Sequence, residues 1–301
     1  MRLVTRGDLD GLTSAVILTM KEPVDSVLLV HPQDITDRRI PIHKTDILAN
    51  LPYHPDCGMW FDHHLITESN ATPPPEVQGK HRVAPSAARV IFDYYLEKAP
   101  DDPALLRLRK LVEETDRLDS AQLTHDDVVN PRDFILLGYT IDGRTGLGAF
   151  HDYFLKLVDW LKTMSAEEIL QQPEVAERAN RIRAEQEEFK KLLQRSSFQL
   201  SNVVVTDLRD MERMPVGNRF LIYTLFPETN VSLRVHWGPK RNSVIAAVGH
   251  NIFNRTCNTS AGELMSRYGG GGHRGAGTCV LPLETAPQAI QEILMELQVN
   301  G

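Results

Sequence analysis

Carboxylate and imidazole side chains gather at two points near the N-terminus of the chain. Asp8 and Asp10 lie two residues apart in the run Thr-Arg-Gly-Asp-Leu-Asp-Gly, and Asp62, His63 and His64 follow about fifty residues later. Aspartate offers hard oxygen atoms and histidine offers imidazole nitrogen, a donor mixture that suits Mn²⁺ or a similar divalent cation. Together the two groups predict a metal site.

Each group also has an ordinary structural explanation when it is taken alone. Aspartate is favoured at helix N-termini, so Asp8 and Asp10 could simply cap the helix that follows them. Residues 62–64 could be a polar turn with solvated imidazoles. The metal interpretation is favoured because both groups come directly after predicted strands.

The elements expected around these residues place both groups at one edge of a sheet. Apolar runs predict strands over 1–5, 26–30 and 58–61, a short element over 44–51, and a helix over 12–20. Alternating strands and helices indicate a parallel sheet, and ligands bind outside the carboxyl ends of such strands. We therefore expect an α/β fold with the acidic and imidazole groups at that edge.

The pattern changes along the rest of the chain. Residues 67–82 are polar and contain three consecutive prolines, which predicts a loop, and helices are expected over 84–98 and 103–114. Residues 150–197 look mostly helical and highly charged, and β-like runs occupy 203–206, 219–225, 231–236 and 244–248 before a final helix over 285–297. We predict a catalytic domain over 1–149, a helical linker over 150–200 and a smaller α/β domain over 201–301.

A glycine-rich run, Gly-Gly-Gly-Gly-His-Arg-Gly-Ala-Gly, begins at Gly269 in the smaller domain. Successive glycines allow backbone N–H groups to converge on an anion. The alternative is a helix C-cap followed by a loop. His273 and Arg274 add side chains suited to phosphate. The predicted substrate-binding residues are Arg6, Asn254, Arg255, Gly270, Gly271, Gly272, His273 and Arg274.

Composition limits the classes of protein that the chain can belong to. The 301 residues suffice for two domains, and the net charge of −7 argues against binding long nucleic acid over the whole surface. The three cysteines form no CxxC pair, so neither a disulfide framework nor a structural zinc site is expected. No apolar run or leader pattern suggests a membrane span or secretion, and the cytoplasm is the expected location.

The combined motifs resemble the DHH phosphoesterase superfamily. The resemblance rests on Asp-x-Asp-Gly at 8–11, an isolated Asp46, Asp-His-His at 62–64, a later aspartate and the distal glycine-rich run. Residues 50–53 and 144–148 resemble the exopolyphosphatase-related branch. The resemblance extends over almost the whole chain, and it implies a divalent-metal-dependent phosphohydrolase.

The resemblance also implies a role for each residue of the motifs. Asp8 would bind one ion and Asp10 the other, with Asp46 bridging them. His63 and Asp116 would complete the second ion's ligands, and Asp119 is the alternative late ligand. Asp62 and His64 would act on the substrate phosphate or beside the ligands. The expected cofactor is Mn²⁺ or Mg²⁺, as one or two ions per chain, with the active site in a cleft between the domains.

Arg6 departs from the family pattern, which usually has histidine at this position. A guanidinium group has no acceptor lone pair and stays protonated, so Arg6 cannot be a metal ligand. Three interpretations remain beside a catalytically dead protein. The first ion binds weakly, another residue such as His31 replaces the missing ligand, or Arg6 stands in for the first ion's charge and contacts phosphate.

The resemblance leaves the substrate open. A polyphosphate-like polyanion is implied by the branch resemblance, while short oligoribonucleotides or bisphosphorylated nucleosides are implied by the wider superfamily. Cyclic dinucleotides are a third candidate. A degenerate module that only binds a phosphorylated ligand is the non-enzymatic alternative. The expected partner is a phosphorylated small polyanion or short oligonucleotide, and a homodimer is one candidate assembly.

Overall fold

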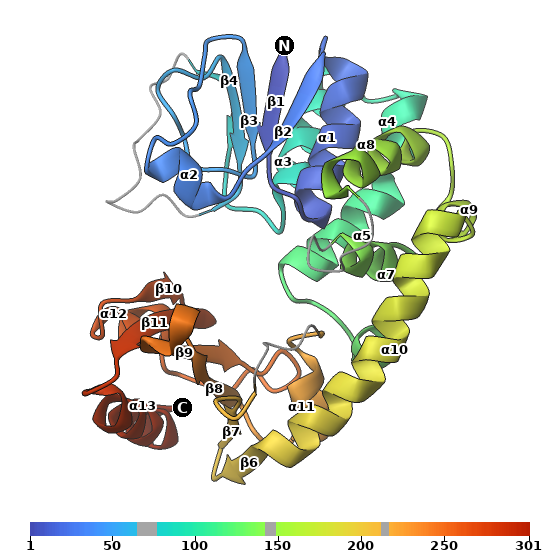
Figure 1. The fold of residues 1–301 in the computed structure, drawn as a ribbon. Coiled ribbons are helices and arrows are strands. Elements are labelled where there is room, and N and C mark those ends of the chain that lie inside the picture. Colours follow the sequence, from blue (N-terminus) through green and yellow to red (C-terminus); the bar gives the residue numbers. More distant parts are fainter. Residues whose placement is uncertain (65–76, 142–148, 212–216) are drawn as a thin grey trace. The chain divides into compact units, whose positions relative to one another are not determined.

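The computed structural model describes residues 1–64, 77–141, 149–211 and 217–301. They form two compact units (Figure 1). Unit 1 comprises Met1–Leu123 and Pro131–Arg181, and unit 2 comprises Thr124–Asn130 and Ile182–Gly301. The long helix α10 (Pro173–Ser196) contributes to both units. Residues 150–181, which the sequence assigned to a linker, belong to unit 1, so this compact unit does not end at residue 149.

Unit 1 contains a five-stranded, fully parallel sheet in the order β2-β1-β3-β4-β5. Its strands are β1 (Arg2–Thr5), β2 (Ser26–Leu29), β3 (Asp46–Ala49), β4 (Met59–Asp62) and β5 (Gln78–His81). The predicted parallel α/β fold is thus confirmed. Strand β5 lies inside the region predicted to be a loop. The prediction missed it because its short sequence, Gln-Gly-Lys-His, contains no apolar residue that would indicate a strand.

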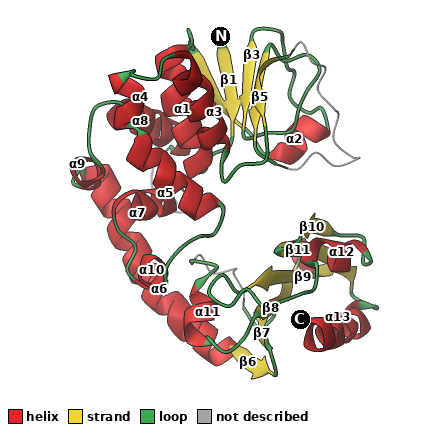
Figure 2. Cartoon of the chain, turned by 180° about the vertical axis from the view of Figure 1, so that it is seen from behind, coloured by secondary structure: helices red, strands yellow, loops and turns green. Residues whose placement is uncertain are grey.

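Both faces of this sheet are covered (Figure 2). Helices α1 (Leu9–Lys21), α3 (Ala87–Lys98) and α8 (Phe150–Leu161) lie on one face, and α2 (Pro32–Thr36) lies on the other. Alternate strand residues supply the two apolar layers, because successive side chains of a strand point to opposite faces. Leu3, Ile47 and Phe61 pack under the first group of helices, whereas Val4, Leu48 and Trp60 pack with Ile35 of α2.

The remaining helices of unit 1 are α4 (Pro103–Arg107), α5 (Arg109–Asp119), α7 (Asp133–Thr140) and α9 (Ala166–Leu170). The single helix predicted over 103–114 is therefore two helices that break at Leu108. Helix α5 continues five residues beyond the predicted end, which places Asp116 and Asp119 within its last turns. This extension determines which aspartate reaches the metal centre.

Unit 2 contains a six-stranded mixed sheet in the order β10-β11-β9-β8-β7-β6. The strands are β6 (Ser197–Leu200), β7 (Val203–Asp207), β8 (Val231–Trp237), β9 (Ser243–His250), β10 (Gly271–His273) and β11 (Ala276–Pro282). Its helices are α6 (His125–Val129), α11 (Leu221–Leu225), α12 (Ala261–Ser266) and α13 (Ala286–Asn300), with a 3₁₀ turn, η2, at Pro239–Arg241. The run over 219–225 was predicted to be β-like, but it contains the helix α11. The apolar residues Leu221, Ile222 and Tyr223 are buried from this helix and not from a strand.

Within the described ranges, none of the helices combines the length and the apolar composition that a membrane-crossing segment needs. The three cysteines are buried free thiols, as expected from their spacing.

Candidate metal centre

The turn between β1 and α1 brings two aspartates to the carboxyl edge of the parallel sheet. Asp8 is the N-cap of α1, and its Oδ1 accepts a hydrogen bond from the Gly11 amide at 2.9 Å. The turn is tight enough to require glycine at position 11, because a Cβ there would lie 2.0 Å from the Arg6 carbonyl oxygen. The tight turn directs Asp10 inward, where it is only 1 % exposed.

Asp10 is held as a buried carboxylate by the start of another helix. Its Oδ2 and Oδ1 accept hydrogen bonds from the backbone N–H groups of Ala87 and Ala88, at 2.9 and 2.7 Å. These groups begin α3, where the helix dipole favours negative charge. Burial, and then the charges of Asp119 and Asp8, nevertheless raise the pKa of Asp10 well above its usual value. The site therefore concentrates negative charge that a cation would neutralise.

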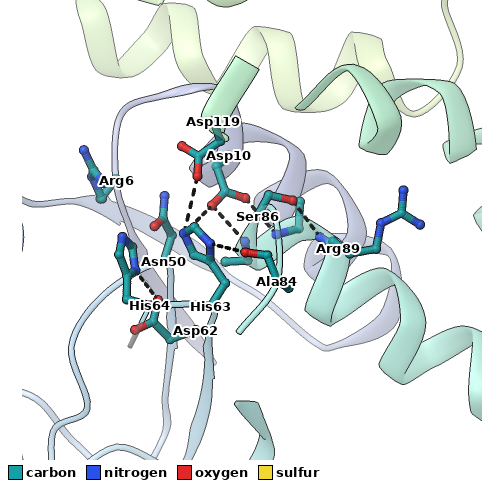
Figure 3. Close-up of polar contacts among 12 residues, drawn as sticks. Arg6, Asp10, Asn50, Asp62, His63, His64, Ala84, Ser86, Arg89 and Asp119 are labelled. Atoms are coloured by element: carbon teal, nitrogen blue, oxygen red, sulfur yellow. Dashed lines mark hydrogen bonds and ion pairs between the residues drawn. The ribbon is translucent and has the colours of Figure 1, made fainter. Parts of the chain in front are cut away.

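His63 presents an unpartnered nitrogen to two carboxylates (Figure 3). Its Nδ1 lies 3.0 Å from the carbonyl oxygen of Ala84, which can only accept, so Nδ1 carries the proton. In the neutral ring Nε2 then has a lone pair. It is buried without a hydrogen bond, 3.7 Å from Oδ2 of Asp10 and 3.4 Å from Oδ2 of Asp119. Three acceptor atoms that converge in this way fit a divalent cation between them.

Asp119, rather than Asp116, reaches this point. Asp119 lies at the end of α5, and burial raises the pKa of its carboxyl group. Asp116 is turned away, since its carboxylate accepts a hydrogen bond from Ser86 at 2.6 Å and pairs with Arg89 at 2.8 Å. The choice of Asp116 as the late ligand is corrected accordingly, because its acceptor oxygens already have donors on α3.

Asp46 lies at the opposite end of the sheet. It opens β3, where the strand register pairs it with Arg2 at the start of β1. Strand rise places it about 10 Å from the carboxyl edge. Its buried carboxylate binds the Arg2 guanidinium and accepts the His43 amide at 2.8 Å. The predicted bridging role of Asp46 is therefore corrected, because the residue is a structural ion-pair partner far from the ligands.

Asn50 directly follows β3, at the carboxyl edge of the sheet. Its backbone adopts a left-handed conformation with φ of 56°, which asparagine tolerates better than most residues. Its Nδ2 donates to Oδ1 of Asp8 at 3.2 Å, and its Oδ1 is buried without a hydrogen bond. Sequence reasoning missed this residue, although it directly follows the apolar run of β3.

Arg6 lies beside Asp8 at the same edge. Its Nε is 3.1 Å from Oδ2 of Asp8, and both side chains are about one-third exposed. His31, the proposed replacement ligand, is exposed and caps α2, where its Nδ1 accepts the Gln33 amide at 3.2 Å. The structure gives no sign that His31 serves as a ligand in place of Arg6.

Asp62 and His64 form a pair next to the ligands. Nδ1 of His64 donates to Oδ1 of Asp62 at 2.8 Å, and this hydrogen bond is the main cause of a raised His64 pKa. Asp62 is buried while His64 is half exposed, so the ring is held from behind and faces outward. Asp62, His63 and His64 also form a compact donor group. We favour the group Asp10, His63 and Asp119 because Nε2 of His63 is unbonded and faces both of these carboxylates, whereas Asp62 and His64 are bonded to each other.

The glycine-rich run of unit 2 forms a hairpin rather than an open loop. Gly269 and Gly270 cap α12 through bonds to Ser266 and Met265, and β10 pairs antiparallel with β11. A Cβ on Gly270 or Gly272 would lie 2.1 Å or 2.2 Å from the carbonyl oxygens of Thr278 and Ala276, whereas a Cβ on Gly271 would meet no neighbouring atom. His273 and Arg274 are exposed at the hairpin tip.

The loop that carries Asn254 and Arg255 is bonded to this hairpin. The His250 amide donates to the Gly275 carbonyl oxygen at 2.8 Å. Nη2 of Arg274 donates to the backbone carbonyl oxygen of Asn258 at 3.4 Å. Arg255 is exposed and Asn254 is partly buried. The structure thus places four predicted substrate residues on two linked segments of unit 2. Residues 144–148, part of the predicted resemblance, lie outside the described residues.

A solved structure resembles the whole chain. The pGpG-specific phosphodiesterase PggH from Vibrio cholerae is 37 % identical, with a TM-score of 0.83, and the similarity covers 100 % of this chain and 99 % of that one. The DHH domain of PF0399 is 14 % identical, with a TM-score of 0.66, over 99 % of this chain and 86 % of the other. The chain belongs to the DHH phosphoesterase superfamily. The predicted family and its metal-dependent phosphoesterase class are confirmed.

Other similarities of this DHH phosphoesterase are more distant. An exopolyphosphatase-related protein from Bacteroides fragilis is 10 % identical, with a TM-score of 0.58, and covers 99 % of this chain and 92 % of that one. At this identity the likeness shows the fold alone. No protein-family model and no curated protein matches the chain.

The two sides of this edge differ in the donor groups that they offer to a cation. Asp10, His63 and Asp119 supply two carboxylates and one imidazole within 4.8 Å of one another. Around Asp8 the neighbouring groups are a guanidinium and an amide N–H₂. The guanidinium and the N–H₂ offer no lone pair to a cation, and the other atom of that amide, Asn50 Oδ1, is a buried acceptor without a hydrogen bond.

Proposed function

We propose that the chain hydrolyses the phosphodiester bond of a short linear nucleotide such as pGpG, with a divalent cation at Asp10, His63 and Asp119. The observation that carries this proposal is the full-length similarity, at 37 % identity, to a pGpG-specific phosphodiesterase. The unpartnered Nε2 of His63, facing two carboxylates, supports the dependence on a metal ion.

The ligands favour Mn²⁺ or Mg²⁺, because two carboxylates and one imidazole form a mainly hard donor set. When bound, such an ion supplies positive charge to the phosphate oxygens and acidifies a water molecule. The protein's own contribution is to fix the ligand geometry. The Ala84 carbonyl group sets the tautomer of His63, and the amides of Ala87 and Ala88 orient Asp10.

His64 is the group we propose for contacting the scissile phosphate or its leaving oxygen. Its hydrogen bond to Asp62 raises its pKa, so a larger fraction of its rings is cationic near neutral pH. The same bond fixes the ring with Nε2 directed away from Asp62. A positioned imidazolium can stabilise a phosphate oxygen or donate a proton to the leaving group.

We further propose that Arg255, His273 and Arg274 of unit 2 bind a phosphate group of the substrate. An arginine can bind phosphate through two parallel hydrogen bonds. Gly270 and Gly272 are required by close backbone contacts in the hairpin, so we assign the anion contacts to the side chains at the tip rather than to a backbone cradle. A linear dinucleotide has a terminal phosphate that such a group could recognise.

The test is hydrolysis of a small panel by the full chain with Mn²⁺: pGpG, a longer oligoribonucleotide, a cyclic dinucleotide and polyphosphate. We expect release of mononucleotide from pGpG, and loss of most activity in His64→Gln with unchanged Mn²⁺ affinity. His31→Gln, which changes an exposed capping imidazole, is the matched control and should retain activity.

Two outcomes would overturn the proposal. Phosphate release from polyphosphate without cleavage of pGpG would assign the chain to the other substrate class. Binding of pGpG without turnover of any substrate would make it a degenerate binding module.

A further inference from the structure

We infer that the chain holds one divalent ion, at Asp10, His63 and Asp119, and that Arg6 and Asn50 fill the place of a second cation by binding Asp8. The inference rests on the metal dependence in the proposed function. In a two-metal centre both cations neutralise charge on the substrate phosphate. The inference says which groups of the chain supply positive charge when one metal position lacks its ligands.

The carboxylate of Asp8 is already supplied with donors from the chain. Its Oδ1 accepts from the Gly11 amide at 2.9 Å and from Asn50 Nδ2 at 3.2 Å, and its Oδ2 pairs with Arg6 Nε at 3.1 Å. A carboxylate has about four lone-pair sites. Three of these sites have donors, so an ion could use only the remaining site of Asp8 unless it displaced a guanidinium or an amide.

The surroundings of Asp8 do not offer a second set of ligands. Asn50 turns its N–H₂ side, not its oxygen, toward Asp8, and Arg6 has no lone pair. Among the residues that the structure describes, Asp8 is in neither of the two groups of three close metal-ligating side chains. Two buried acceptors lack a hydrogen bond here, Asn50 Oδ1 and His63 Nε2. Nε2 of His63 faces two carboxylates, those of Asp10 and Asp119, so we assign the cation to that position.

Arg6 can therefore serve as the missing positive charge. Its guanidinium is cationic at every working pH, and one-third exposure leaves it accessible to a substrate phosphate. The ion pair with Asp8 is about one-third exposed and therefore weak, so Arg6 can exchange Asp8 for a phosphate oxygen at small cost. The arrangement supplies one fixed charge where a metal ion would supply two.

The backbone at position 50 permits a direct test. Its φ of 56° suits asparagine and aspartate alike, so Asn50→Asp can keep the fold. Such an aspartate would face Asp8 and restore an oxygen donor, and Arg6→His would restore an imidazole. The double variant should bind a second ion that the natural chain does not.

The experiment counts Mn²⁺ ions per chain by calorimetric titration and by elemental analysis after desalting. We expect one ion for the natural chain, one for Asp8→Asn, none for Asp10→Asn and two for Arg6→His/Asn50→Asp. The charge-matched control Arg39→His/Asn130→Asp changes an exposed arginine of unit 1 and the C-cap of α6, and should stay at one ion. Circular dichroism establishes that each variant is folded.

Two ions of comparable affinity on the natural chain would overturn the inference, and so would a folded double variant that still binds one. If the double variant fails to fold, the counts for the natural chain and Asp8→Asn decide alone. The count is separate from catalysis. One ion without cleavage of any nucleotide would reject the proposed function and leave this inference standing. Two ions with cleavage of pGpG would reject this inference and leave the proposed function standing.

Discussion

Replacement of Asp119 by asparagine should weaken metal binding, whereas the same change at Asp116, one helical turn earlier, should not. Both residues lie in the last turns of α5. Asp119 directs Oδ2 to within 3.4 Å of His63 Nε2, while Asp116 is bound to Ser86 and Arg89. The pair of variants separates a metal ligand from a structural carboxylate with identical chemistry.

The magnitude follows from the charge that is removed. Two unit charges 4 Å apart interact by about 1 kcal/mol in water and about 4 kcal/mol near a protein surface, and a divalent ion doubles these values. Asp119 is 29 % exposed, and asparagine keeps one oxygen donor, so the lower half of the range applies. A loss of about 2–4 kcal/mol corresponds to roughly a 30- to 700-fold rise in the Kd for Mn²⁺.

The assay is calorimetric titration of Mn²⁺ into each variant, followed by urea denaturation. For Asp116→Asn we expect a Kd within about threefold of the natural chain and a loss of about 1–2 kcal/mol in the free energy of unfolding, because Arg89 loses a charge-assisted partner. A larger loss of Mn²⁺ affinity in Asp116→Asn than in Asp119→Asn would refute the assignment.

Three further changes test other parts of unit 1. Asp46→Asn should lower the free energy of unfolding by about 2–3 kcal/mol in urea, since it removes the carboxylate that pairs with the partly exposed Arg2, and should leave the Kd for Mn²⁺ unchanged; loss of ion binding would contradict the placement of Asp46. Gly11→Ala should cost about 2–4 kcal/mol in a thermal melt, because its Cβ would meet the Arg6 carbonyl oxygen, and an unchanged melting temperature would contradict the tight turn. Burial raises the pKa of the Cys57 thiol to about 11, whereas a thiol in the unfolded chain has a pKa of about 8.5. The neutral buried thiol therefore contributes its full share to the free energy of unfolding below a pH of about 8.5, and this share is lost as the pH rises toward 11. Iodoacetamide at pH 9 should accordingly label Cys57 slowly in the native chain and rapidly in urea; equal rates would reject this.

The sequence was sufficient to predict the parallel sheet and the edge at which the candidate metal centre lies. Asp8, Asp10 and the residues 62–64 follow β1 and end β4, and these positions are apparent from the apolar runs that precede them. The family resemblance was likewise confirmed. Such features depend on local pattern and on a general rule for the carboxyl ends of parallel strands.

The errors arose where the choice depended on contacts between distant residues. Asp46 was selected because a carboxylate was expected, but its place at the start of β3 follows from pairing with Arg2. Asn50 lies beside Asp8 at the carboxyl edge of the sheet, but its side chain is an amide and not a carboxylate. Asp116 and Asp119 lie three residues apart on one helix, so spacing alone could not separate them, and only the position of Arg89 on α3 does so.

Asp10 has two tasks, and this affects how loss-of-function alleles should be interpreted. It is a proposed ligand, and it also accepts two backbone hydrogen bonds that hold the start of α3. Asp10→Ala would leave two buried N–H groups unpaired, at about 1–3 kcal/mol each, in a fold of ordinary marginal stability. Cells carrying that allele would contain less protein, whereas cells carrying Asp119→Asn would contain inactive protein. A phenotype shared by both alleles reflects the missing reaction, and one seen with Asp10→Ala alone reflects the missing polypeptide.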